Sequence, residues 1–304
     1  MIVALAGGVG AARFLQGLAR IVPQRDLFVI GNVGDDAEIH GLHIAPDLDT
    51  VMYTLAGIAN RAQGWGLERE TFHCLDALTQ IGGEAWFRLG DRDLATHLYR
   101  TDRLRAGATL SRITRELCAA LGVQARIVPA TDDRLRTIVR TDRGRLEFQE
   151  YFVRRHARDT VRALDFDGAR QARPAAGVLA AIARATAIIV CPSNPFISIG
   201  PILAVRGIRD ALRRTRATVT AISPIVGGRA IKGPAARMMK SMGHGASAAA
   251  VAELYRDFVD VFVLDRQDAK LEPAVEALGM RVIVTNTIMS GTAQRKALAR
   301  VVLR

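Results

Sequence analysis

A glycine-rich loop near the N-terminus contains the first residues suited to chemistry. It reads Gly-Gly-Val-Gly-Ala-Ala-Arg from Gly7 to Arg13, between the first predicted strand and the first predicted helix. Glycines at Gly7, Gly8 and Gly10 would let backbone N–H groups approach phosphate oxygens, and the helix start adds positive potential. The forked guanidinium of Arg13 could reach a second phosphate. The loop predicts a phosphate site; the alternative is a tight turn without a ligand.

The same loop departs from two common nucleotide-binding signatures. Gly8 and Gly10 occupy the first two glycine positions of a dinucleotide fingerprint, but Arg13 stands where the third glycine belongs. The lysine of a Walker A loop is also missing. An acid near Asp35 could still bind a ribose hydroxyl, so an NAD-dependent oxidoreductase is one alternative.

Two acidic clusters follow the loop, Asp35-Asp36 and Asp47-Leu48-Asp49. Carboxylates near a phosphate site are hard oxygen ligands suited to Mg²⁺, and one could take a proton from an attacking hydroxyl. The alternative is that they cap turns and helices, with Asp49 as the N-cap of a helix that begins at Thr50. We expect Asp35 and Asp49 to be the functional acids, while for Asp36 and Asp47 capping is an equal alternative.

Two later segments could contact a planar or phosphorylated ligand. In the segment 86–97, Arg88 follows an aromatic pair, and such groups can stack on a heterocycle. The alternative there is a salt-bridged helix start. After a predicted buried strand, Ser193, Asn194 and Ser198 offer small hydrogen-bonding groups near a helix start, which suits phosphates. A plain Pro/Gly turn is the alternative for this loop.

Apolar, β-branched runs alternate with helical patterns over most of the chain, which is typical of βαβ units and a parallel sheet. Residues 51–159 interrupt the alternation with mainly helical patterns and a predicted hairpin, 136–140 with 146–152. We therefore expect an α/β fold in which 1–50 and 160–304 form the core and 51–159 form a smaller, mostly helical cap. Loops at the carboxyl ends of the strands should line the ligand site.

Charge, hydropathy and cysteine content limit the classes of protein to which the chain could belong. The 304 residues carry a formal net charge of +12, but the arginines that cause it are spread along the sequence. Without a basic tail or stacking platform, this charge favours phosphorylated small molecules over nucleic acid. No apolar run approaches the roughly 20 residues of a membrane span. Three scattered cysteines, Cys74, Cys118 and Cys191, predict a reducing, cytoplasmic location.

Six motifs, taken in order, closely resemble the 2-phospho-L-lactate transferase family of coenzyme F420 biosynthesis: GGVGAAR, NVGDD, PDLDT, WFRLGDRDLATH, SNPFISIGPIL and SPIVGGRAIKGPAA. The resemblance runs from Ala6 to at least Ala236. Enzymes of this family join a deazaflavin alcohol, Fo, to a phospholactyl-type group carried on GMP through a diphosphate. The resemblance implies Mg²⁺-dependent attack by the terminal ribityl hydroxyl of Fo on the phosphorus next to the three-carbon group, with GMP leaving. That group could be lactyl, enolpyruvyl or glyceryl.

The resemblance also implies a fold and roles for individual residues. It implies a Rossmann-like three-layer core, a smaller subdomain that contributes to the deazaflavin site, and a homodimer. Asp49 matches the family's aspartate that touches Fo and metal, and Arg88 matches its Fo-contacting basic position. Asp35 is the expected additional Mg²⁺ ligand. The diphosphate of the donor is expected at Gly7, Gly8, Gly10, Arg13, Ser193, Asn194 and Ser198.

A nucleotide-sugar-binding regulatory protein of the same broad superfamily is a second alternative. It would share the glycine loop but would need no Fo site. The WFRLGDRDLATH and PDLDT segments count against it.

Overall fold

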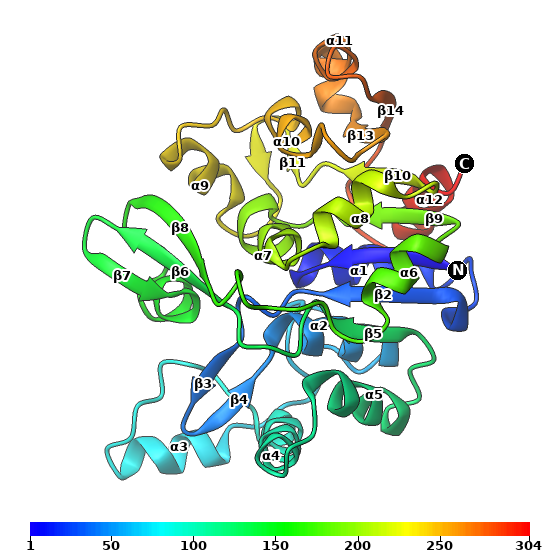
Figure 1. The fold of residues 1–304 in the computed structure, drawn as a ribbon. Helices are drawn as coiled ribbons and strands as arrows, with labels where there is room; N and C mark the ends of the chain where they lie inside the picture. The colour runs from blue at the N-terminus through cyan, green and yellow to red at the C-terminus, as the bar shows by residue number, and fades with distance from the viewer.

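A seven-stranded parallel sheet forms the centre of the computed structural model, which describes residues 1–304 (Figure 1). The strand order is β14-β13-β10-β9-β1-β2-β5. The chain builds outward from β1 through β2 to β5, and then returns to add β9, β10, β13 and β14 on the other side of β1. The order therefore reverses between β1 and β9, and open α/β sheets bind ligands at such a point. The strands are β1 (Ile2–Ala6), β2 (Leu27–Gly31), β5 (Arg126–Pro129), β9 (Ala187–Val190), β10 (Thr218–Ile222), β13 (Val261–Asp265) and β14 (Arg281–Thr285).

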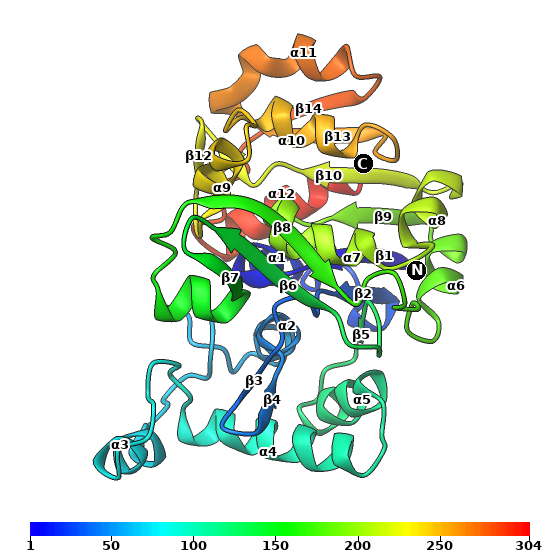
Figure 2. The same ribbon diagram turned by 60° about the vertical axis from the view of Figure 1, so that its left-hand side comes forward.

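Helices cover both faces of this sheet, which explains why its strands are continuous apolar runs (Figure 2). On one face α1 packs against both α2 and α12, and on the other α8 packs against α6 and α7. These helices are α1 (Gly8–Leu18), α2 (Pro46–Ala56), α12 (Thr292–Val302), α6 (Val178–Arg184), α7 (Gly200–Ala204) and α8 (Ile208–Arg214).

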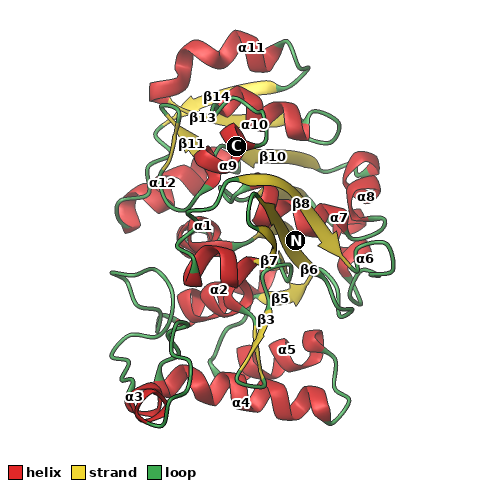
Figure 3. Cartoon of the chain, turned by 90° about the vertical axis from the view of Figure 1, so that its left-hand side faces the viewer, coloured by secondary structure: helices red, strands yellow, loops and turns green.

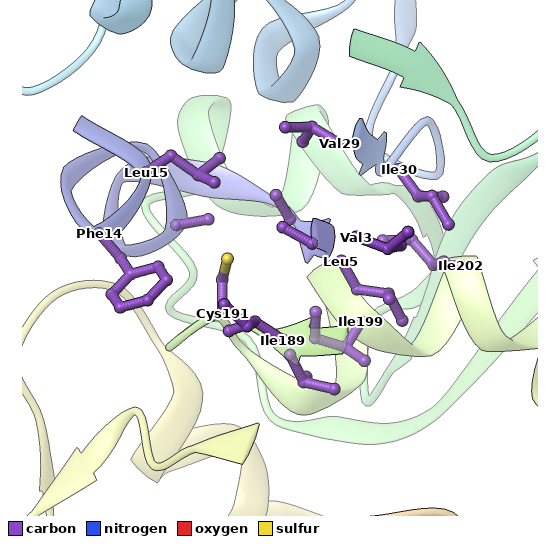
Figure 4. Packing of buried hydrophobic residues seen from close by; sticks show 14 of the residues in the cluster. Val3, Leu5, Phe14, Leu15, Val29, Ile30, Ile189, Cys191, Ile199 and Ile202 are labelled. Atoms are coloured by element: carbon purple, nitrogen blue, oxygen red, sulfur yellow. The ribbon is translucent and has the colours of Figure 1, made fainter. Parts of the chain in front are cut away.

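The packing around β1 shows how the core fixes the end of that strand. Val3 and Leu5 lie near Ile199 and Ile202, while Phe14 of α1 packs elsewhere in the same buried cluster (Figure 4). All five side chains are completely buried. Because the strand is held from both faces, the loop that follows it at Gly7 has a fixed starting point.

Two smaller parts extend from the carboxyl edge of the sheet (Figure 3). One is mostly helical, with α3 (His73–Gln80), α4 (Asp91–Arg105), α5 (Leu110–Ala120) and the hairpin β3 (Ala37–Ile39) with β4 (Leu42–Ile44). The other is an antiparallel sheet in the order β7-β6-β8, formed by β6 (Arg136–Thr141), β7 (Gly144–Glu147) and β8 (Val161–Asp167). The remaining strands and α-helices are β11 (Ile225–Val226), β12 (Arg229–Ala230), α9 (Ala235–Ser241), α10 (Ala248–Tyr255) and α11 (Glu272–Glu276).

The expected α/β fold with a parallel sheet, a smaller helical part and a hairpin is confirmed. The second hairpin strand is shorter than predicted. It ends at Glu147, and a helical turn follows at Glu150–Arg154, because Phe148 and Tyr151 are buried together at a spacing of three residues. The two-part division of the chain at residues 50 and 160 stays a prediction, and the central sheet includes one strand, β5, from within 51–159. None of the helices is both long and apolar enough to span a membrane.

Candidate active site

The loops after β1 and β9 meet where the strand order reverses. Ser193 Oγ donates a hydrogen bond of 2.8 Å to the carbonyl oxygen of Gly7 and accepts one of 3.4 Å from the Gly7 amide. A Cβ at Gly7 would lie 2.7 Å from Ser198 Cβ, so Ser198 closes against the same loop. Asn194 Oδ1 instead accepts a hydrogen bond of 2.9 Å from the amide of Phe196 and caps the helical turn that follows. The structure thus brings Gly7, Ser193 and Ser198 together, while Asn194 shapes the turn.

The glycines of the first loop have distinct structural roles. Gly8 adopts a φ of 71°, a left-handed conformation that favours glycine. A Cβ at Gly10 would overlap the carbonyl oxygen of Pro192, so this glycine lets α1 approach the loop after β9. Because α1 begins at Gly8, earlier than the sequence predicted, its first amides lie within the loop and lack partners inside the helix. Those amides are suited to phosphate, and that role stays a prediction.

Asp47 lies directly against the glycine loop. Asn32 Nδ2 donates a hydrogen bond of 2.8 Å to Asp47 Oδ2, and a Cβ at Gly7 would lie 2.7 Å from that same oxygen. Burial raises the pKa of Asp47 to about 6, although the hydrogen bond from Asn32 opposes the shift. For Asp47, the sequence analysis left capping as an equal alternative, and Asn32, the first residue of the motif NVGDD, was assigned no role of its own.

Asp35 and Asp36 complete an acidic cluster with Asp47. Burial, followed by repulsion from Asp47 and Asp36, raises the pKa of Asp35 well above its ordinary value. Asp36 Oδ2 lies 3.0 Å from His43 Nε2 on the hairpin of β3 and β4. Gln149 Nε2 donates a hydrogen bond of 2.8 Å to the backbone carbonyl of Asp35. The carboxylates therefore share a buried volume in which their mutual repulsion is only partly compensated.

Asp49 faces α4 rather than capping its own helix. Because α2 begins with Pro46 in its first turn, Asp49 lies inside the helix, and its alternative role as N-cap before Thr50 is wrong. Arg100 donates a hydrogen bond to Asp49 Oδ1, and His97 Nδ1 lies 3.8 Å from Asp49 Oδ2. Burial raises the pKa of Asp49, while the positive charge of Arg100 acts against the increase.

A second carboxylate lies near the other ring nitrogen of His97. His97 Nε2 lies 3.4 Å from Asp93 Oδ1, which accepts a hydrogen bond of 2.7 Å from the hydroxyl of Tyr53. Both His97 and Arg100 are 1% exposed. Sequence reasoning missed Arg100, although Asp93, His97 and Arg100 follow one another at helical spacing on one face of α4.

Whether these residues fit Mg²⁺ depends on the carboxylate oxygens that have no hydrogen-bond partner. Asp35 Oδ1, Asp36 Oδ1 and Asp49 Oδ2 are buried and accept no hydrogen bond. Carboxylate oxygens are the ligands that Mg²⁺ prefers. No group of three or more His, Cys, Asp or Glu side chains is arranged to hold a metal by itself. The residues therefore fit an ion bound by one or two carboxylates and completed by substrate phosphates, which is the usual form of a Mg²⁺ site.

Arg88 lies on the mostly helical part of the structure. Its guanidinium is stacked over the ring of Phe72, 4.2 Å from the centroid. Just before Arg88 in the sequence, the rings of Trp86 and Phe87 pack edge to face, with their centroids 5.7 Å apart. Asp91, the first residue of α4, accepts hydrogen bonds from two backbone amides at the start of α3 and so joins the two helices. The Fo-binding role of Arg88 stays a prediction.

Arg13 is one of several cations beside the glycine loop. Burial, followed by the charge of Arg13, lowers the pKa of Lys232. Burial, followed by Arg13 and Arg61, lowers the pKa of Arg295, which also donates a hydrogen bond to Gln16 on α1. These cations come from separate segments of the chain and repel one another. Their combined positive potential favours an anion next to α1.

Comparison with known proteins identifies the family to which the chain belongs. The family model described as 2-phospho-L-lactate transferase CofD matches residues 2–288. The chain belongs to this family. It is 47% identical over 309 residues to the phosphoenolpyruvate transferase of Streptomyces avermitilis, covering 98% of this chain and 97% of that protein. It is 39% identical over 303 residues to the 2-phospho-L-lactate transferase of Methanothermobacter thermautotrophicus, covering 100% and 97%.

Family membership confirms the resemblance drawn from the six motifs. The chain is an enzyme of the transferase class that moves a phosphoenolpyruvyl- or phospholactyl-type group. A solved structure of a UPF0052 family protein from Bacillus halodurans matches with a TM-score of 0.69 over 100% of this chain and 98% of that chain. At 16% identity, this likeness supports the fold alone.

Proposed function

We propose that the enzyme transfers a phosphoenolpyruvyl group from a GMP-linked diphosphate to the terminal ribityl hydroxyl of Fo and releases GMP, as a step of coenzyme F420 biosynthesis. The family match supports a transfer of this kind. The names of the relatives favour the enolpyruvyl form. Identity is 42 to 47% with those named phosphoenolpyruvate transferase and 38 to 39% with those named 2-phospho-L-lactate transferase.

The observation that carries the proposal is the buried acidic cluster beside the glycine loop, at the reversal of strand order. Asp47 touches the loop at Gly7, and Asp35 is near enough to Asp47 for their charges to interact. The carboxylates of this cluster repel a phosphate group bound at the adjacent loop unless a cation lies between the two negative charges. This supports a site in which the carboxylates would hold a metal ion that neutralises charge on a bound diphosphate.

We propose Asp35 and Asp49 as the protein ligands of Mg²⁺, with Asp36 as a neighbouring oxygen donor. When bound, the ion would neutralise charge on the diphosphate oxygens. The amides of Gly8 and Gly10 would bind the nonbridging oxygens together with Arg13, while Gly7, whose amide donates to Ser193 Oγ, would border the diphosphate. Ser198 would approach the same diphosphate, and Ser193 and Asn194 would hold the loops in place through their backbone hydrogen bonds.

The proposed reaction forms one bond and breaks one. The ribityl oxygen bonds to the phosphorus next to the three-carbon group, and the bond from that phosphorus to the bridging oxygen of GMP breaks. The proton of the hydroxyl passes to a carboxylate of the cluster. Asp47 suits this task, because a pKa of about 6 lies close to neutral pH. Arg88 would orient the deazaflavin ring of Fo, and Asp49 would contact its hydroxyl chain.

We further propose that the enzyme acts in the cytoplasm as a homodimer. Its three cysteines are free, and two of them, Cys118 and Cys191, are buried, which agrees with a reducing compartment.

The proposal is tested by incubating the protein with Fo, Mg²⁺ and each GMP-linked donor in turn, followed by mass spectrometry. The expected result is a phosphodiester of Fo and release of GMP, with the enolpyruvyl donor used fastest. Faster use of the lactyl or glyceryl donor would correct the three-carbon group alone. If no donor reacted while the protein bound a nucleotide sugar or NAD, the regulatory or oxidoreductase alternative would replace the proposal.

A further inference from the structure

The guanidinium of Arg100 makes contacts in two directions, and only one of them leads to Asp49. Its Nη2 donates a hydrogen bond to Asp49 Oδ1. Its Nη1 lies 3.2 Å from His97 Nδ1 and donates a longer hydrogen bond, of 3.4 Å, to the backbone carbonyl of His43. A guanidinium can only donate hydrogen bonds. The nitrogen of His97 that faces it must therefore be the acceptor.

This contact fixes the position of the hydrogen on the His97 ring. If Nδ1 carried a hydrogen, two donors would face each other across 3.2 Å in a buried site, where such a loss of pairing is costly. The ring hydrogen therefore lies on Nε2, the nitrogen that is 3.4 Å from Asp93 Oδ1. Tyr53 of α2 donates a hydrogen bond of 2.7 Å to the same oxygen of Asp93, so this carboxylate is itself held in place.

The nitrogen of His97 without a hydrogen also faces Asp49. It lies 3.8 Å from Asp49 Oδ2, an oxygen that is buried and accepts no hydrogen bond. Without a hydrogen on Nδ1, His97 cannot donate to that oxygen. Arg100 thus satisfies Oδ1 of the carboxylate, while Oδ2 stays free although a ring nitrogen lies beside it.

The pair formed by Arg100 and Asp49 departs from a common arrangement of arginine and carboxylate. Such pairs are frequently bidentate, with two parallel hydrogen bonds from the guanidinium to the two oxygens. Here the second terminal nitrogen of Arg100 is used by His97 and by the backbone of His43. The backbone of His97 is fixed as well, because its carbonyl accepts a hydrogen bond of 2.7 Å from Thr101 Oγ1, which accepts one of 2.8 Å from the His43 amide.

We propose that His97 is a positioning residue that keeps one oxygen of Asp49 free. By accepting a hydrogen bond from Arg100, His97 holds the guanidinium in the orientation that pairs with Oδ1 alone. Without this acceptor the guanidinium turns and binds both oxygens of Asp49, which blocks the oxygen available to a metal ion or to the hydroxyl chain of the acceptor. The role given to Asp49 rests on the proposed function, but the geometry of the three side chains does not.

Two substitutions of His97 separate its hydrogen-bonding role from its packing role. His97→Asn places an amide oxygen near the position of Nδ1 and keeps an acceptor for Arg100, whereas His97→Leu removes the acceptor. We expect Mg²⁺ to raise the melting temperature of wild type and His97→Asn but to have little effect on His97→Leu. With substrates, His97→Leu should lose at least about tenfold in kcat and keep the KM for the donor, which is expected at the loop after β1. His40→Asn, at the exposed tip of the hairpin of β3 and β4, is the matched control and should behave as wild type does.

Two further measurements do not depend on turnover. NMR of the ring nitrogens of His97 should show the hydrogen on Nε2, and a crystal structure of His97→Leu should show Arg100 bonded to both oxygens of Asp49. The proposal is overturned if Nδ1 carries the hydrogen, if Arg100 still pairs with Oδ1 alone in His97→Leu, or if that variant responds to Mg²⁺ as wild type does. If His97→Leu does not fold, His97→Gln replaces it, because its amide reaches the position of Nε2 and leaves no acceptor facing Arg100. Should no donor react while these measurements agree with expectation, the proposed function fails and the positioning role stands.

Discussion

The guanidinium of Arg100 donates a hydrogen bond to Asp49 Oδ1, and both side chains are buried. This ion pair joins α2 to α4 and leaves Asp49 Oδ2 without a hydrogen bond. One carboxylate therefore has a structural oxygen and a free oxygen. Any experiment on Asp49 must therefore separate the structural role of the residue from its chemical role.

Asp49→Asn should reduce turnover to near zero and also lower stability. It removes one partner of a buried ion pair, and such losses cost about 3–5 kcal/mol because the other charge stays buried. Urea unfolding would measure the stability, and circular dichroism would check that secondary structure is kept. The double variant Asp49→Asn with Arg100→Met removes both charges and should recover much of the lost stability without recovering activity. Activity near the wild-type level at saturating Mg²⁺ in either variant would refute the catalytic role of Asp49.

Mg²⁺ should raise the melting temperature of the wild-type protein in the absence of substrates. A ligand that binds only the folded state stabilises it in proportion to the logarithm of its concentration. Asp35→Asn should reduce the increase, since it removes a buried carboxylate with an unpartnered oxygen. Asp102→Asn, on the exposed side of α4, is the matched control and should respond as wild type does. Equal increases in all three proteins would exclude Asp35 as a ligand.

The acidic cluster should make the protein less stable as the pH rises from about 4 to 6. Folded Asp47 keeps its proton up to about pH 6, whereas an unfolded aspartate loses it near the ordinary value of 3.8. Folding therefore takes up a proton in this window, and the free energy of unfolding falls as the pH rises through it, by about 3 kcal/mol for a shift of this size. Asp47→Asn keeps a hydrogen-bond acceptor for Asn32 and should remove this decrease in the free energy of unfolding. Urea titrations at pH 4 and 7 in EDTA would measure it, and parallel pH profiles for the two proteins would contradict the assignment.

The parts of the site that the sequence predicts are those set by local pattern. The apolar run of β1 followed by glycines places the loop after a strand, and the run at 187–191 places Ser193 after another. Because parallel strands end at one edge of a sheet, these loops were expected near each other. The residue types also singled out Asp35, Asp49 and Arg88, and the family resemblance then assigned them roles toward Mg²⁺ and Fo.

The parts that the sequence does not predict depend on contacts between distant segments. Asp47 was equally compatible with capping, since nothing near it in sequence shows that Asn32, 15 residues earlier, donates a hydrogen bond to it. The start of α2 was placed too late because Pro46, a favoured residue in the first helical turn, was not used as a start signal. Arg100 was missed for the same kind of reason, as its partner lies 51 residues away.

Gly10→Ala should destabilise the fold through a steric contact, independently of any ligand. A Cβ at this position would overlap the carbonyl oxygen of Pro192, so α1 would have to move away from the loop after β9. Overpacking of this kind costs typically about 1–3 kcal/mol. Gly245→Ala is the matched control, because the nearest atom to its new Cβ would be Ser247 Oγ at 4.0 Å. Thermal unfolding of the two variants would decide, and equal melting temperatures would show that Gly10 is not required for close packing.

Arg88→Lys should weaken Fo binding while leaving the stability of the protein almost unchanged. The guanidinium of Arg88 stacks over Phe72 as a flat, delocalised cation, and an ammonium keeps the charge but loses the planar surface. Because Arg88 is exposed, the change should alter the free energy of unfolding by no more than about 0.5 kcal/mol. Deazaflavin fluorescence titration would give the affinity, with Arg69→Lys, another exposed arginine of the helical part, as the control. If Arg88→Lys and Arg69→Lys bound Fo equally tightly, the planar guanidinium would have no part in recognising the ring, and the Fo site would have to be sought elsewhere around Asp49.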